Sequence, residues 1–99
     1  MNWLEIINVY PARPQEKIKV LEICSKIRVA GNGNNSAELK VYGSSFNPEL
    51  SIHINWTSQS EPQGKSPLGR ALSRAFSDLG LVSHTLWVEY GQSASDKTN

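Results

Sequence analysis

The segment from Trp3 to Tyr10 constrains the fold most, because large apolar side chains occupy both of its alternating faces. One face carries Leu4, Ile6 and Tyr10, and the other carries Trp3, Ile7 and Val9. Pro11 and Pro14 end the segment, as expected for a strand. A strand that is apolar on both sides needs cover on both sides. We therefore expect a strand that is covered on both of its faces.

Two later segments have the period of an amphipathic helix. In the first, which starts at Gln15 and is expected to end at Gly31, the inner stripe is Val20, Ile23, Cys24 and Ile27, and the outer face is Glu16, Lys19, Glu22 and Lys26. The second starts at Ser66-Pro67, a hydroxyl cap followed by proline at the first helical position. Its stripe is Leu68, Ala71, Leu72, Ala75, Phe76 and Leu79, and Gly80 is expected to close it.

Three further segments alternate with the period of a strand: Ala37 to Gly43, Leu50 to Trp56 and Val82 to Tyr90. The order of elements is thus β-α-β-β-α-β. With right-handed crossovers this order predicts a ferredoxin-like α+β fold, in which a four-stranded antiparallel sheet carries both helices on one face. We expect residues 1–90 to form a single domain and residues 91–99 to be a polar tail.

Composition excludes several classes of partner. Of the 99 residues, 38% are hydrophobic and 19% charged, and the net charge is only +1. This balance argues against binding to nucleic acid or to an anionic membrane. No run of apolar residues is long enough for a membrane helix, and the N-terminus lacks the basic region of a signal peptide. Cys24, the single cysteine, is expected to be a buried thiol, and we expect a cytoplasmic protein.

The sequence lacks the motif of a metal site and that of a phosphate-binding loop. The acidic and histidine residues do not have metal-ligand spacing, so no metal is expected. The segment Gly64-Lys65-Ser66 precedes a helix, but Gln59 stands where a phosphate-binding loop has its first glycine, and Pro67 removes an amide. At most, Lys65 could contact an anion.

The sheet face opposite the helices predicts self-association. That face is not plainly polar, because Ile6, Tyr42 and Trp87 all have the parity that places them there. A second copy of the chain is the simplest cover for such a face. We therefore expect a homodimer with its two sheets facing each other, and Ile6, Tyr42 and Trp87 in the interface.

Three local features resemble the antibiotic-biosynthesis-monooxygenase family of dimeric α+β barrels. The first strand runs into a turn rich in proline and basic residues, Asn8-Val9-Tyr10-Pro11-Ala12-Arg13-Pro14-Gln15. The third strand ends in Asn55-Trp56-Thr57-Ser58-Gln59, and an amphipathic helix and a terminal strand follow. The resemblance covers about residues 3–90. It implies a homodimer with a small pocket in each protomer, between sheet and helices, and either an oxygenase without cofactor, a haem-degrading enzyme or a protein with no known activity.

The haem-degrading branch of that family uses an asparagine on the first strand, a tryptophan at the end of the third strand and a histidine ligand on the following helix. Asn8 and Trp56 match the first two positions. The ligand is missing, because residues 66–80 contain no histidine and Ser66 stands about where one is expected. We therefore expect no haem and no other cofactor.

Four residues are the candidates for a site. His53 and His84 are the candidate catalytic residues, since a histidine can accept a proton near neutral pH. Asn8 and Trp56 are the candidate ligand-binding residues, which would line or adjoin the pocket. Each also has an ordinary structural alternative: His53 in a dimer interface or on a half-exposed sheet, His84 and Trp56 in the packing of the core, and Asn8 as a buried amide with protein partners.

Two classes of function follow from these observations. The chain either binds a hydrophobic or aromatic small molecule, which it could also oxidise without a cofactor, or it is a non-catalytic interaction or scaffold protein of the same fold. The oxidation would begin when a histidine removes a proton from a phenolic substrate, and the anion would then react directly with oxygen. An enzyme needs a cavity with convergent polar groups, whereas a scaffold fills that space with side chains.

Overall fold

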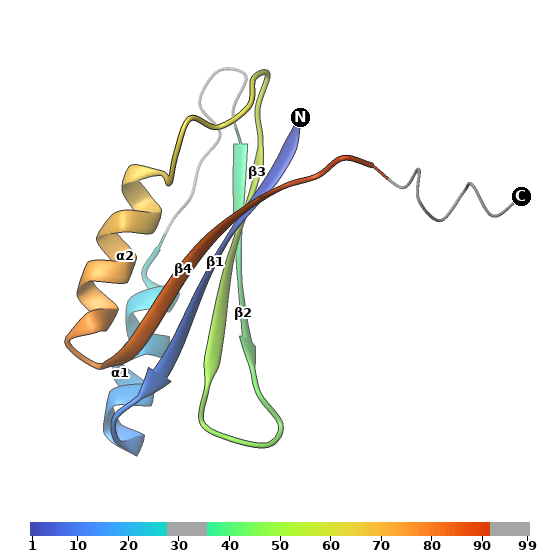
Figure 1. Cartoon of the computed structure of the whole chain (residues 1–99). Helices are drawn as coiled ribbons and strands as arrows, with labels where there is room; N and C mark the ends of the chain where they lie inside the picture. Colours follow the sequence, from blue (N-terminus) through green and yellow to red (C-terminus); the bar gives the residue numbers. More distant parts are fainter. Residues whose placement is uncertain (28–35, 92–99) are drawn as a thin grey trace, which may run out of the picture.

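The computed structural model describes residues 1–27 and 36–91 and confirms the ferredoxin-like α+β fold (Figure 1). Its elements are β1 (Asn2–Pro11), α1 (Pro14–Ser25), β2 (Ser36–Gly43), β3 (Leu50–Thr57), α2 (Pro67–Ser77) and β4 (Gly80–Val88). Gly31 and all of the expected polar tail beyond residue 91 lie outside the described residues.

The four strands form one antiparallel sheet in the order β2-β3-β1-β4. The first strand is therefore one of the two inner strands, between β3 and β4. Along β1, Trp3 is paired with Trp56 of β3 and Ile7 with His84 of β4. This register determines which side chains of β3 and β4 meet those of β1.

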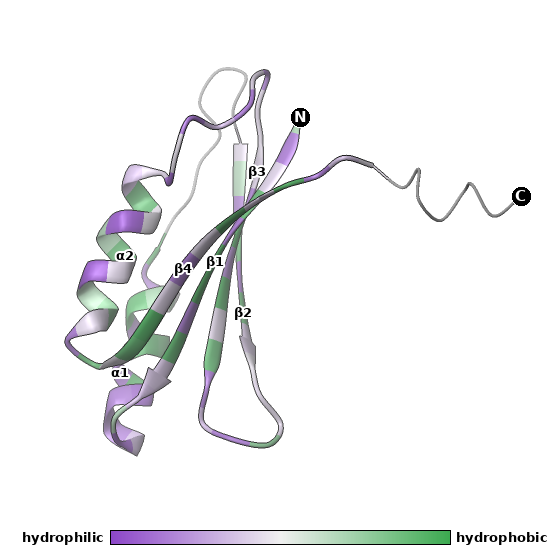
Figure 2. Cartoon of the chain, in the orientation of Figure 1, coloured by the Kyte–Doolittle hydropathy of each residue, from purple (hydrophilic) through white to green (hydrophobic). Residues whose placement is uncertain are grey.

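Both helices lie on the same side of the sheet, and the hydrophobic core lies between them and the sheet (Figure 1). Hydrophobic and hydrophilic residues alternate along the strands and around the helices (Figure 2). The core consists of Ile7, Val9, Val20, Cys24, Leu50, Ile52, Ile54, Leu72 and Phe76. No helix in residues 1–27 and 36–91 has the length and apolar character needed to span a lipid bilayer.

The helix α1 differs from its prediction in two respects. It ends at Ser25, several residues before Gly31. Glu16, expected on the outer face, is buried at 3% exposure. Its carboxylate accepts a hydrogen bond from Arg13 at 2.6 Å and lies 3.2 Å from Lys19 Nζ. These two cations explain why an acidic side chain can be buried at the start of the helix.

The helix α2 begins as predicted and ends earlier. Ser66 caps it, because the Ser66 side chain accepts a hydrogen bond from the Gly69 amide at 2.9 Å. The last helical residue is Ser77, so Gly80 is the first residue of β4 and does not close the helix. A Cβ at Gly80 would overlap the carbonyl oxygen of Tyr10, so glycine is required there by the close approach of β1.

The face of the sheet opposite the helices is not covered by any part of the described chain (Figure 1). We call it the open face, and it presents Leu4, Ile6, Asn8, Lys40, Tyr42, His53, Asn55, Thr85 and Trp87. Leu4 and Ile6 are half-buried at its centre. Tyr42 and Trp87, on the two edge strands, are 48% and 58% exposed. The strand β4 ends at Val88, so Tyr90 lies beyond it and is exposed.

Candidate functional site

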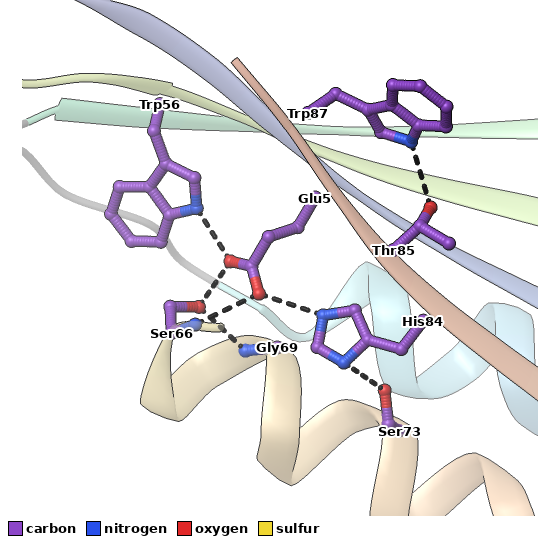
Figure 3. Close-up of polar contacts among 8 residues, drawn as sticks. All are labelled: Glu5, Trp56, Ser66, Gly69, Ser73, His84, Thr85 and Trp87. Carbon is purple, nitrogen blue, oxygen red and sulfur yellow. Dashed lines mark hydrogen bonds and ion pairs between the residues drawn. The ribbon is translucent and has the colours of Figure 1, made fainter. Parts of the chain in front are cut away.

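The most unusual side chain on the helix-facing side of the sheet is Glu5, which is completely buried. Its Oε2 accepts hydrogen bonds from Trp56 Nε1 at 2.8 Å and from the Ser66 hydroxyl at 2.5 Å. Its Oε1 accepts from the Ser66 amide at 3.0 Å and lies 2.8 Å from His84 Nε2 (Figure 3). A carboxylate has about four lone-pair positions, so each one here has a partner.

The register of the sheet brings these groups together. Trp56 is paired with the residue two before Glu5, and His84 with the residue two after it. Both are therefore diagonal neighbours of Glu5 on the same face of the sheet, close enough for long side chains to meet. Two of the four sequence candidates, Trp56 and His84, thus converge on a residue that the sequence analysis did not include.

The N-terminus of α2 supplies the remaining contacts of Glu5. Ser66, 8% exposed, gives Glu5 both its amide and its hydroxyl proton while its oxygen accepts the Gly69 amide. Gly69 packs directly on this cluster: a Cβ there would overlap the Glu5 carboxylate and lie 2.9 Å from His84 Cε1. Only glycine lets the helix approach the sheet this closely.

His84 connects the cluster to the middle of α2. Its Nδ1 lies 3.0 Å from Ser73 Oγ, and its side chain is 8% exposed. Carboxylate, imidazole and hydroxyl stand in the order of a nucleophilic relay. Ser73 lies inside α2, however, and the two clefts described below are lined by neither Ser73 nor His84. The arrangement therefore joins β1, β4 and α2, and this geometry favours a structural role.

His53 lies on the open face and is separated from His84 by the sheet. Its ring centroid is 4.6 Å from that of Tyr42, and its Nε2 is 3.0 Å from Ser51 Oγ. Burial lowers the pKa of His53 below its ordinary value of 6.5. The neutral imidazole is the favoured form on this face at neutral pH.

Asn8 also faces away from the helices. It is paired with Ser51 on one side and Ser83 on the other, and it is half-buried. The four candidates therefore divide into two pairs, with Trp56 and His84 on the helix side and Asn8 and His53 on the open face. The structure does not bring them together around one pocket.

Two clefts are formed by residues near these groups. The open face is hollowed over about 590 Å³, and Leu4, Tyr42, His53 and Trp87 are among the lining residues. A second cleft of about 490 Å³ lies between the Trp3 and Trp56 side chains and the chain from Ser58 to Pro67, with Arg70 at its edge. We call this the loop cleft. Both volumes are within the range of small-molecule sites.

The wall of the loop cleft is a fixed pair of indoles. Trp3 and Trp56 stack with centroids 5.3 Å apart and an interplanar angle of 14°. Trp3 Nε1 donates to Ser58 Oγ at 3.0 Å, while Trp56 Nε1 donates to Glu5. Because both N–H groups are bonded within the protein, the indoles present apolar ring surface to the cleft.

The remaining reactive groups do not form a site. Cys24 is buried, and burial raises the pKa of its thiol to about 11, so the thiol stays protonated at neutral pH. In residues 1–27 and 36–91 there is no cluster of histidine, cysteine and acidic side chains that could hold a metal ion.

Sequence reasoning missed Glu5, although one signal was present. Glu5 has the same parity on β1 as Trp3, Ile7 and Val9, which face the core. An acidic residue at a core-facing position requires partners, because an unpaired buried charge is too costly. An acidic residue at a core-facing position could therefore have identified Glu5. Its hydrogen-bond partners come from distant elements, so the pattern along β1 could not name them.

Comparison with known proteins adds no relative: no family model matches the chain, and no curated protein or solved structure matches it significantly.

Proposed function

We propose that the chain is a cytoplasmic homodimer whose sheets face each other and whose protomers each bind an aromatic small molecule in the loop cleft. The dimer corresponds to the assembly implied by the resemblance to antibiotic-biosynthesis-monooxygenase proteins. The single cysteine, with its buried thiol, supports a reducing compartment.

The open face carries the proposal of a dimer. Trp87 donates its indole N–H to Thr85 Oγ1 at 2.9 Å along the same strand, so its ring can cover apolar surface without leaving a donor unpaired (Figure 3). Ile6 lies between β3 and β4 at the centre of this face. Ile6, Tyr42 and Trp87 are already about half buried, so covering the rest of them would contribute roughly 2–5 kcal/mol, about half the value for full burial, before the entropy of association is subtracted.

Charge on the same face favours a second copy over an uncharged partner. Glu38 has the same parity on β2 as Lys40, so both side chains lie on the open face, and their charged atoms are 3.6 Å apart. In a two-fold dimer, Glu38 of one copy can face Lys40 of the other, and Lys40 can face Glu38. The surface is therefore self-complementary in charge. Both side chains are more than half exposed and are available for such contacts.

Ligand binding is supported by the two stacked indoles that wall the loop cleft. Binding is favoured over oxidation because Glu5 and His84, the acid–base pair nearest this cleft, are hydrogen-bonded to each other and to protein partners. In the scaffold alternative the cleft would bind no small molecule.

Sedimentation at micromolar concentration tests the dimer. We expect the unchanged protein to sediment as a dimer and Trp87→Glu to shift the population to folded monomer. Ile18→Glu is the matched control, since Ile18 is similarly exposed at 57% but lies on α1. A well-folded monomer in the unchanged protein, or equal dimerisation of both variants, would overturn the dimer. Ile6→Lys, at the centre of the face, is a second variant.

Titration with 2-naphthol tests the ligand site independently. The indole N–H signals of Trp3 and Trp56 should shift in an NMR spectrum, while that of Trp87, assigned from Trp87→Phe, should not. An unchanged spectrum would favour the scaffold alternative.

A further inference from the structure

We infer that the natural ligand of the loop cleft carries a negative charge next to its aromatic ring, as in an aromatic carboxylate. This inference rests on the proposed function, which places an aromatic molecule in the cleft, and it adds the chemical class of that molecule.

The first support is the pair of cationic side chains at the rim of the cleft. Lys65 and Arg70 both line it and both are exposed. Neither forms an ion pair with an acidic side chain in the described part of the chain, whereas Arg13 and Lys19 both do. Glu61 is the one acidic residue among those lining the cleft. The lining of the cleft therefore carries two cationic side chains and one anionic side chain.

The second support is the position of the Arg70 guanidinium. A Cβ at Gly64 would lie 3.7 Å from Arg70 Nη2, so the guanidinium reaches from α2 across to the loop. An arginine fork is suited to bidentate recognition of a carboxylate. The indole pair lines the same cleft as Arg70, so one small molecule can place a planar ring on the indoles and a carboxylate at Arg70.

Three residues at the start of α2, Ser66, Pro67 and Gly69, offer no free amide to an anion. The Ser66 amide is bonded to Glu5 and the Gly69 amide to the Ser66 side chain, while Pro67 has no N–H. The selection of a charged ligand then rests on the side chains of Lys65 and Arg70, which line the cleft.

The test compares 2-naphthoate with 2-naphthamide, which has nearly the same shape and no charge. Binding is followed by the indole N–H signals of Trp3 and Trp56. The carboxylate should bind about tenfold more tightly than the amide. Arg70→Gln should remove this preference by weakening only the carboxylate. Arg74→Gln is the matched control, because Arg74 is exposed on the same helix and does not line the cleft.

The outcomes separate this inference from the proposed function. Equal affinity for the two compounds, or an unchanged preference in Arg70→Gln, would overturn the charge selection while leaving an aromatic site in place. A loss of preference in Arg74→Gln as well would also overturn it, because a general change in surface charge would then explain the result. If neither compound nor 2-naphthol shifts the Trp3 and Trp56 signals, the ligand site fails as a whole, and this inference fails with it.

Discussion

Glu5 Oε1 lies 2.8 Å from His84 Nε2, and the two residues come from the central strand and an edge strand of the same sheet. The buried carboxylate of Glu5, on β1, is contacted by side chains of β3 and β4 and by the start of α2. Because every oxygen position of Glu5 is occupied by a protein donor, the cluster fixes how α2 sits on the sheet, and with it one side of the loop cleft.

Glu5→Gln should destabilise the protein by about 3 kcal/mol. Each carboxylate oxygen accepts from a group that can only donate, the Trp56 indole on one side and the Ser66 amide on the other. Either orientation of the glutamine amide therefore places a donor against a donor. Urea unfolding measures the change, and Glu22→Gln, at an exposed position on α1, is the control and should stay within about 0.5 kcal/mol. A similar small loss in Glu5→Gln would show that the cluster contributes little.

Gly69→Ala should lower stability by about 2 kcal/mol, although alanine is normally the better helix former by about 1 kcal/mol. The added Cβ would overlap the Glu5 carboxylate and crowd His84. In Gly64→Ala, the control, the Cβ meets only the end of Arg70 at 3.7 Å. Thermal unfolding compares the two variants, and a stabilised Gly69→Ala would mean that α2 does not approach the sheet this closely.

Ser66→Ala should cost about 2 kcal/mol, roughly twice the value of an ordinary helix cap. The hydroxyl both caps α2 and donates to Glu5, so two interactions are lost at once. Ser77→Ala, near the other end of the helix, removes only an exposed hydrogen bond to the Arg74 carbonyl and should change little. If the two substitutions lowered the free energy of unfolding in urea by the same amount, the double role of Ser66 would be refuted.

His53 should make the protein less stable at mildly acidic pH. Burial lowers its folded-state pKa below the ordinary 6.5, so the unfolded chain takes up a proton at a higher pH than the folded chain. The stability that neutral His53 provides is complete above the unfolded pKa and is lost as the pH falls through that value toward the lower folded one. Lys40 is paired with His53 across β2 and β3, and the Tyr42 ring lies against the His53 ring, while Glu38 and Glu89 line the same hollow.

The measurement is the difference in Tm between about pH 7.5 and about pH 5.5, in the unchanged protein and in His53→Gln. The difference should be smaller in the variant. The two proteins differ only at position 53, so comparing them isolates the contribution of His53. An identical pH dependence in the two would exclude His53 as the origin.

Much of the fold could be predicted from the sequence because its periods are unambiguous. Trp3 to Tyr10, followed by Pro11, has the pattern of a strand and forms most of β1, and Ser66-Pro67 marks the start of α2. The errors came from polar residues whose partners are not local. Glu16 was assigned to a solvent-facing position because of its charge, yet Arg13 and Lys19 allow it to be buried.

The site was less predictable than the fold for the same reason. Trp56 and His84 were named from the sequence, but the residue that unites them, Glu5, was not. Asn8 and His53 were assigned to the same pocket, although the alternation of β1 and β3 puts them on the other side of the sheet. A pattern along one strand shows which residues share a face, and only the pairing of strands shows which of them meet.

The position of β1 in the sheet also determines when the structure can be completed during synthesis. Glu5 and His84 are separated by 79 positions along the chain, and β1 must accept β4, the last strand, on one of its two edges. Until β4 has left the ribosome, the buried carboxylate lacks its imidazole partner and the central strand has an unpaired edge. Contacts between such distant residues slow folding, because a long loop must close before they can form. The sheet can therefore be completed only after nearly all of the described length has been made, and a nascent chain that ends before β4 leaves one edge of β1 open to pairing with other chains.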